Sequence, residues 1–168
     1  LIDPNTLSDD GTVSMASTEV SPQAGYLAYT LSDGGSDWKT VHVRDVSTKQ
    51  DMNDTLSGVK FTNIAWLPDE TGFYYSRYPQ DENGEYDDSQ TVSIYFHQLG
   101  TEQREDKLVF KFDDKPTWNP YPEVIQDGET LLISVFEGYQ SNGVYAKSLT
   151  EEGPLVPIFD KWDGRYEL

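Results

Sequence analysis

The sequence predicts an all-β fold, a β-propeller fragment of about three four-stranded antiparallel blades. A Gly-containing turn followed by a hydrophobic strand occurs three times along the chain. The second strand after each turn closes on Val46, Leu99 or Leu149, which are 53 and 50 residues apart, and Trp66 and Trp118 are 52 apart. A period near fifty that is filled with short strands is typical of propeller blades.

The composition suits thin β-layers. A length of 168 residues fits one ordinary domain. Hydrophobic residues make up only 36%, yet 11 Tyr, 7 Phe and 4 Trp concentrate apolar area in few side chains. Aromatic residues that recur at blade spacing usually fill the layers between blades, so we expect Trp66 and Trp118 to lie in the core.

The charge and the missing cysteines exclude several function classes. With 30 acidic and 12 basic residues the net charge is −18, so nucleic acid and anionic membranes are poor partners, and a solvated acidic surface is the simplest interpretation. The absence of Cys rules out disulfides and thiolate metal sites. No apolar run approaches the ~20 residues of a membrane helix. The compartment, cytoplasmic or periplasmic, stays open.

The first expected blade follows a turn-rich entry segment at 1–12, where Asp9-Asp10-Gly11 is a tight-turn signal. The blade itself spans 13–58. β-branched and aromatic residues bounded by Gly, Pro, Asn and Asp mark its strands. These strands are expected at 14–20, 26–32, 38–46 and 52–56.

The second expected blade spans 59–116 and contains a long acidic hairpin loop at 81–88, too polar to bury and therefore expected to be mobile. The loop fails the EF-hand template, because the first and twelfth ligand positions would be Pro79 and Gln90. We interpret it as a solvated loop. The strands of this blade are expected at 60–66, 72–78, 92–99 and 107–110.

The third expected blade spans 117–160, and 161–168 is expected to start a further blade, with its strand at 165–168. A propeller needs at least about four blades to close its ring. The chain also begins without Met. We therefore expect a piece of a longer protein. The strands of the third blade are expected at 118–125, 130–136, 143–149 and 155–159.

The two histidines, His42 and His97, fall at nearly equivalent places in successive blades. No acidic partner pattern accompanies them in the sequence, so structural roles are expected and no metal site. Ser36 lacks the Gly-x-Ser-x-Gly elbow of a nucleophile, and no Walker or dinucleotide glycine pattern occurs. The sequence predicts no catalytic residue and no cofactor.

Several segments, taken in order, resemble the prolyl oligopeptidases, a family of serine peptidases. The opening thirteen residues, Leu1-Ile2-Asp3-Pro4-Asn5-Thr6-Leu7-Ser8-Asp9-Asp10-Gly11-Thr12-Val13, are the most specific part. The resemblance continues through Gly35-Ser36-Asp37-Trp38, Val59-Lys60-Phe61, Ala65-Trp66 and Tyr75-Ser76-Arg77-Tyr78-Pro79, and it covers essentially the whole chain.

The resemblance implies part of the seven-bladed N-terminal propeller that caps an α/β-hydrolase domain and admits short peptides, which are cut after proline. The family's Ser, Asp and His have no counterpart in this sequence, so the chain itself is expected to be inactive, and its partners are the hydrolase domain of the parent chain and short peptides. Candidate cavity residues are Trp38 in the loop 34–38, Ser89 and Val109. The loop 81–88 is expected to adjust access.

Three alternatives remain open at this point. The first alternative is a stand-alone binding propeller that completes its ring by oligomerisation. The second is a part of a related oligopeptidase of the same clan. A catalytic β-domain such as a glycosidase ranks last, because no pair of carboxylates stands out among many.

Overall fold

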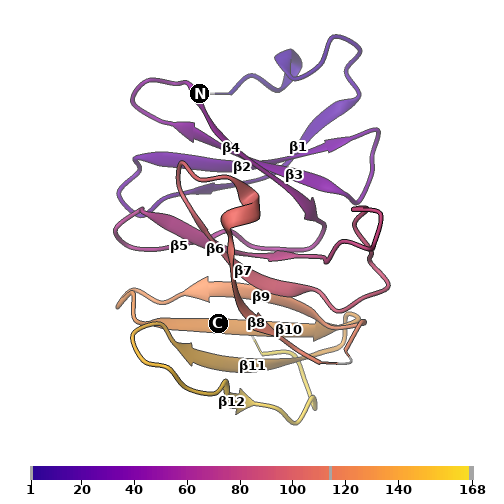
Figure 1. Ribbon diagram of the computed structural model, residues 1–168, viewed down its shortest axis with the longest axis vertical. Helices are drawn as coiled ribbons and strands as arrows, with labels where there is room; N and C mark the ends of the chain where they lie inside the picture. The colour runs from indigo at the N-terminus through magenta and orange to yellow at the C-terminus, as the bar shows by residue number, and fades with distance from the viewer. Residues whose placement is uncertain (1, 114, 167–168) are drawn as a thin grey trace.

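The computed structural model describes residues 2–113 and 115–166, which form three four-stranded antiparallel sheets stacked in chain order (Figure 1). In the first sheet the strands are β1 (Val13–Val20), β2 (Tyr26–Asp33), β3 (Lys39–Asp45) and β4 (Asp51–Val59). The second sheet contains β5 (Ala65–Trp66), β6 (Gly72–Arg77), β7 (Ser93–Gln98) and β8 (Lys107–Lys111). The third contains β9 (Asn119–Val124), β10 (Thr130–Glu137), β11 (Ser141–Ser148) and β12 (Val156–Phe159).

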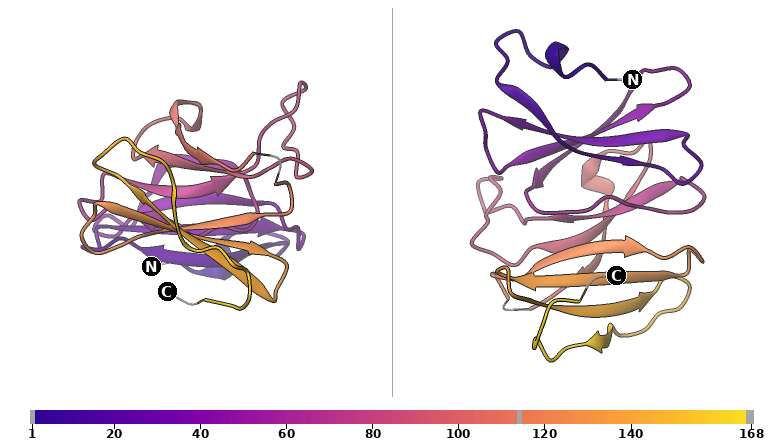
Figure 2. Two further views of the ribbon diagram at one scale, coloured as in Figure 1. Left: turned by 90° about the horizontal axis from the view of Figure 1, so that it is seen from below. Right: turned by 180° about the vertical axis from the view of Figure 1, so that it is seen from behind.

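The sheets pack face to face, as propeller blades do, and the view from behind shows the same order (Figure 2). Each sheet is a simple meander in which every strand pairs with its neighbour in sequence. Successive side chains of a strand point to opposite faces, so a strand covered on both faces needs an unbroken hydrophobic run. In β6, Phe73 and Tyr75 face the first sheet and Tyr74 faces the third. The predicted all-β propeller fold is confirmed.

Two hydrophobic clusters fill the spaces between the sheets. The cluster between the first and second sheets comprises Ala28, Val41, Val43, Leu56, Val59, Ile64, Trp66, Phe73 and Tyr75. The cluster between the second and third comprises Ala65, Tyr74, Ile94, Leu131, Ile133 and Val135, with Trp118 packed against it. The two tryptophans expected in the core therefore pack there.

The third sheet contains a matched pair of isoleucines, one buried and one exposed, for measuring the contribution of a methyl group to stability. Ile133 of β10 is 0% exposed and Ile158 of β12 is 51% exposed. We expect Ile133→Val to lower the free energy of unfolding by about 1 kcal/mol and Ile158→Val to leave it nearly unchanged. Urea denaturation of both variants measures this difference; equal effects would contradict the burial of Ile133 between the sheets.

Most expected strands lie within two residues of the observed ones, but two expectations are wrong. The strand expected at 60–66 is reduced to Ala65–Trp66. Upstream of it the Thr62 hydroxyl, instead of a backbone carbonyl, accepts the Ser76 N–H at 2.7 Å. Of the strand expected at 165–168, the last two residues lie outside the described ones. Tyr166 is not in a strand, because its backbone bonds the Asn142 side chain.

Helix is confined to two short 3-10 turns, η1 (Pro4–Thr6) and η2 (Gln103–Glu105), among the described residues. The second turn closes with reciprocal bonds between Glu102 and Glu105, so the chain reverses compactly between β7 and β8. No helix in the described part of the chain is long and apolar enough to cross a membrane.

Candidate functional site

The most feature-rich surface of the molecule is one end of the stack, which we call the loop end. Because the strands alternate in direction, the β2–β3, β6–β7 and β10–β11 loops meet there with the connections from one sheet to the next. The long β6–β7 loop projects at the right of Figure 1. Loops held by a rigid scaffold are where binding residues concentrate. The loop end comprises residues 34–38, 60–64, 78–92, 112–113, 115–118 and 138–140.

An aromatic group at the loop end bridges the first two sheets. The ring of Trp38 lies 5.5 Å from that of Tyr78 in an edge-on arrangement and 6.1 Å from that of Tyr86. Lys60 Nζ lies 4.3 Å from the centre of the Trp38 ring and forms an ion pair with Asp88. A cation held against an aromatic face and a carboxylate fixes the β6–β7 loop against the first sheet.

The structure gathers two of the three predicted cavity residues at this end. Trp38 lines a cavity of about 390 Å³. Ser89 follows Asp88 in the loop and donates its hydroxyl hydrogen to Asp87 at 2.6 Å, so it lies near the Trp38 group and is exposed. Val109 does not join them, because it lies in the middle of β8 and packs against the second cluster. The other lining residues of the cavity are Val13, Leu31, Asp33, Lys39, Thr40, Ser57, Gly58, Glu85 and Tyr86.

A second cavity at the loop end, of about 410 Å³, lies between the third sheet and Phe61 of the β4–β5 connection, and we call it the aromatic hollow. Tyr121 and Phe136 meet edge to face at 5.5 Å, and the Arg165 guanidinium lies 5.6 Å from the Phe136 ring. Phe61 is 41% exposed and Tyr139 is 96% exposed. Exposed rings of this kind can pack against the apolar side chains of a ligand. The hollow is lined by Phe61, Asn119, Tyr121, Phe136, Gly138, Tyr139 and Arg165.

Sequence reasoning missed the aromatic hollow. Its residues come from the β4–β5 connection, β9, the β10–β11 hairpin and the segment after β12, so no local pattern joins them. One local signal does exist. Tyr139 stands between Gly138 and Gln140 at the tip of a hairpin, where Gly, Pro, Asn, Asp and Ser are the common residues, so its large side chain marks the position for inspection.

The acidic loop is stabilised by its own carboxylates. Asp81 Oδ1 accepts the backbone N–H groups of Asn83 (2.8 Å) and Glu85 (2.9 Å), which lowers the pKa of Asp81. Within the described residues no three His, Asp or Glu side chains converge on a metal position. The interpretation of this loop as wholly solvated is wrong at one point. Tyr86 is partly buried and packs over Gly58 of β4.

The two histidines differ in surroundings. His42 of β3 is partly buried, stacks on Tyr29 at 5.4 Å and has its Nε2 atom 3.0 Å from Thr40 Oγ1. Burial lowers the pKa of His42, against a weaker opposing effect of a nearby carboxylate. A neutral ring packed in this way fits the structural role that the sequence predicts.

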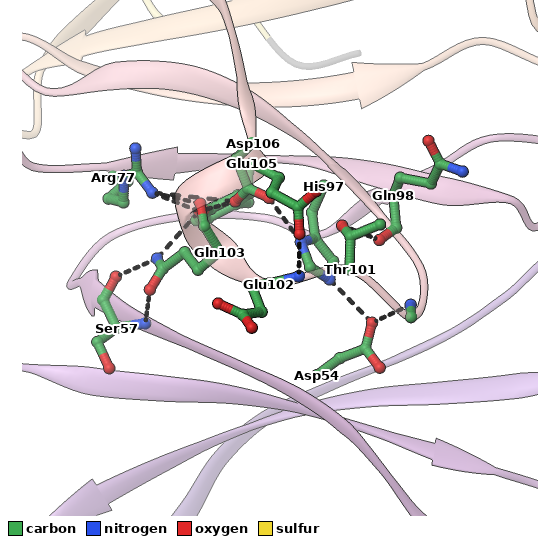
Figure 3. Close-up of polar contacts among 12 residues, drawn as sticks. Asp54, Ser57, Arg77, His97, Gln98, Thr101, Glu102, Gln103, Glu105 and Asp106 are labelled. Atoms are coloured by element: carbon green, nitrogen blue, oxygen red, sulfur yellow. Dashed lines mark hydrogen bonds and ion pairs between the residues drawn. The ribbon is translucent and has the colours of Figure 1, made fainter.

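His97 of β7 lies at the centre of a charged cluster (Figure 3). The ring is fully buried, with Nε2 2.9 Å from Asp54 Oδ1 and Nδ1 2.7 Å from Asp106 Oδ1. Burial alone would lower its pKa, but the hydrogen bonds to Asp106 and Asp54 outweigh burial and raise the pKa to about 9. The sequence shows no acidic partner pattern around His97, yet the fold brings two carboxylates to its ring. Its carboxylates are 43 residues before and 9 after it in the chain.

Comparison with known sequences gives a consistent result. A sequence model described as "Prolyl oligopeptidase, N-terminal beta-propeller domain" matches residues 1–168. Prolyl endopeptidase of Elizabethkingia meningoseptica is 36% identical over 169 residues, which cover 99% of this chain and 24% of that protein. Prolyl oligopeptidase A of Galerina marginata is 32% identical over 190 residues, covering 99% and 26%. The chain thus spans about a quarter of the length of the curated relatives it matches.

Solved structures agree with the sequence comparison. Prolyl oligopeptidase B from Galerina marginata, bound to a 35mer hydrolysis and macrocyclization substrate, superposes with a TM-score of 0.84 at 28% identity, over 98% of this chain and 25% of that one. A structure from a study of two prolyl endopeptidases gives a TM-score of 0.83 at 29% identity, over 96% and 23%.

Proposed function

Because this chain belongs to the prolyl oligopeptidase family, as part of its N-terminal β-propeller domain, we propose that it is a non-catalytic portion of a size filter in a serine peptidase that cleaves short peptides after proline. Its partner in this role is the α/β-hydrolase domain of a parent peptidase. The observation that carries the proposal is the stack of sheets itself, which presents two cavities at its loop end.

A size filter needs packed walls around an opening that a folded protein cannot enter. The second sheet is covered by a hydrophobic cluster on each face, so a large displacement of one sheet from the next would expose apolar surface to water. Filtering therefore requires no special residue in the wall. The β6–β7 loop lies at the loop end and is tethered there by the Lys60–Asp88 pair, which supports the expectation that it adjusts access.

We further propose that the aromatic hollow contacts the peptide. A relative in this family is solved with a 35mer substrate bound, which supports a peptide-binding role. In this chain the exposed rings of Phe61 and Tyr139 supply apolar contact at the loop end. The net charge of −18 favours cationic peptides over anionic ones, and more strongly at low salt.

The parent peptidase tests both parts of this proposal. We expect proline-containing peptides to be cleaved more slowly as their length grows, and folded proteins to be spared. Replacing both Phe61 and Tyr139 with Ala should raise the KM for peptides that reach the hollow about tenfold, a loss of about 1.4 kcal/mol of binding, and leave kcat for a minimal chromogenic proline substrate unchanged.

Two controls make the test specific. Leu108→Ala removes a side chain that is 57% exposed on the outer strand β8, away from the loop end, and should change neither constant. The purified 168-residue chain should not hydrolyse the chromogenic substrate. Turnover that persists through stringent purification would refute the non-catalytic role. A closed oligomer of the chain that binds a defined ligand would favour the stand-alone propeller.

A further inference from the structure

The two interfaces between the sheets are held together differently. Between the first and second sheets, hydrogen bonds and ion pairs follow β4 from Asp54 to its end and into the connection beyond it. Asp54 Oδ1 accepts a hydrogen bond from His97 Nε2 at 2.9 Å and another from the backbone N–H of Gly100 at 2.6 Å. Closer to the end of β4, the carbonyl oxygen of Gly58 accepts a hydrogen bond from the Tyr78 N–H at 2.9 Å.

The centre of this interface is a side-chain amide that pairs with backbone. Gln103 Nε2 donates to Ser57 O at 2.9 Å, and Ser57 N donates to Gln103 Oε1 at 3.1 Å (Figure 3). Gln103 therefore satisfies the outer edge of β4 in the way a further strand would. We call the contacts of Asp54, Ser57, Gly58 and Lys60 with the second sheet and its loops the clasp.

The opposite end of the same interface is also bonded. Glu70 Oε1 accepts the Gln23 N–H at 2.7 Å, and the Gln23 side chain donates to Pro68 O at 2.9 Å. The first and second sheets are thus joined by directional bonds at both ends, and one of these bonds, between His97 and Asp54, is an ion pair whose two side chains are completely or almost completely buried.

The interface between the second and third sheets has few such bonds. Among the described residues, two hydrogen bonds cross it, from Ser76 Oγ to Pro120 O at 2.5 Å and from Tyr78 OH to Asn119 Oδ1 at 3.3 Å. The rest of the contact is apolar, made by Tyr74 and Ile94 against the buried residues of β10.

These two kinds of contact respond differently to displacement. A charge-assisted hydrogen bond weakens steeply once its distance and angle change, and a buried charge that loses its partner is costly. Apolar contact is non-directional, so packed layers can slide by small amounts at little cost. We infer that the first and second sheets move as one rigid unit, and that the stack yields between the second and third sheets.

This inference concerns the mechanics of the stack and does not require the proposed peptidase role. Where that role also holds, the inference locates the opening movement: widening of the filter occurs beside the aromatic hollow, whose residues come from both sides of the yielding interface. A distance measurement without peptide tests the mechanics, and peptide-length selection tests the filter, so the two can fail separately.

Spin labels can measure the movement directly, because the chain contains no Cys. Gln50, Gln98 and Glu151 are exposed and lie at the same end of the three sheets. Pairs of cysteines at Gln50 and Gln98 report on the first interface, and pairs at Gln98 and Glu151 on the second. In the full chain we expect the distance distribution of the second pair to be about twice as wide as that of the first. Equal widths, or the reverse order, would overturn the inference.

Two variants test whether the clasp sets the width of the distance distribution of the first pair. Gln103→Ala removes the bonds to Ser57 and should broaden the distribution of the first pair, whereas Ser76→Ala removes one bond across the other interface and should leave the first pair unchanged. If Gln103→Ala has no effect, the clasp does not hold the sheets together. Should labelling prevent folding, native hydrogen exchange replaces it. Strands of the first two sheets should then share one opening free energy and those of the third a lower one.

Discussion

Replacing His97 with Leu is expected to lower the free energy of unfolding by about 3–5 kcal/mol, because the change leaves the buried Asp54 carboxylate without a cation and removes one of the two cations beside Asp106. Leu has nearly the volume of the imidazole, so little of the loss comes from a cavity. The measurement is urea denaturation of the wild type and the variant at pH 6, followed by circular dichroism.

The size of this effect follows from the charges around His97. Both ring nitrogens face carboxylate oxygens, and only the protonated ring can donate to both. Asp106 also accepts the Tyr75 hydroxyl at 2.5 Å and lies 3.9 Å from Arg77, so two cations balance two anions. Asp54 has one buried oxygen, Oδ2, with no hydrogen-bond partner, and this leaves the Asp54 carboxylate dependent on His97.

The same cluster predicts how stability changes with pH. The pKa of His97 is raised to about 9 in the folded chain from an ordinary value of 6.5. Its contribution is therefore complete below pH 6.5 and is lost as the pH rises through about 9. Hydrogen bonds to His97 and Gly100 outweigh burial and lower the pKa of Asp54, and burial raises that of Tyr75, so neither titrates in this window. We expect the wild type to lose stability by up to about 1.4 kcal/mol per pH unit there, and the Leu variant to lose almost none.

His42→Leu is the matched control for both measurements. His42 occupies the third strand of the first sheet as His97 does in the second, but it is partly buried and has one polar contact, with Thr40. Its replacement should cost about 1 kcal/mol or less. Two variants with equal costs, or a wild-type stability that stays flat between pH 6.5 and 9, would show that His97 is not the charged centre of the cluster.

The parts of the fold that follow from local patterns were predictable from the sequence. The alternation of Leu131, Ile133 and Val135 in β10 is enough to place a strand and to identify its buried face. The failure at 60–66 has a local cause that periodicity does not report, because the Thr62 side chain takes the place of a backbone partner. A residue pattern predicts where a strand can form, but the strand forms only where its backbone groups make hydrogen bonds to a neighbouring strand.

The candidate site was less predictable, because it depends on how one sheet lies on the next. Trp38 and Ser89 were expected at a cavity because of a family resemblance; Trp38 lines a cavity at the loop end, and Ser89 lies in the loop that the Lys60–Asp88 pair holds there. Phe61 and Tyr139 share a hollow although they are 78 residues apart in the chain. His97 meets Asp54 in the same way, across the interface between the first and second sheets. Contacts of this kind follow from the offset between sheets, and a single sequence does not encode that offset in any local pattern.

Gly58 belongs to the clasp, and Gly58→Ala is expected to lower the free energy of unfolding by about 2–4 kcal/mol. Two separate costs add. Gly58 has a φ of +73°, which L side chains adopt at a cost of about 1–2 kcal/mol. In addition, a Cβ atom there would lie 2.2 Å from the Tyr86 ring, so the anchor of the β6–β7 loop must move. Urea denaturation measures the total.

A double-mutant cycle with Tyr86→Ala separates these two costs, because removing the ring relieves the clash and leaves the backbone term. The double variant should therefore be less destabilised than the sum of the single ones by about 1–3 kcal/mol. Gly84→Ala isolates the backbone term, since Gly84 has a φ of +83° and nothing within 4 Å of the added Cβ. A cost for Gly58→Ala no larger than that for Gly84→Ala would mean that Tyr86 does not press on β4. The loop would then be held by the Lys60–Asp88 pair, and Lys60→Met would release it in Gly58→Ala and wild type alike.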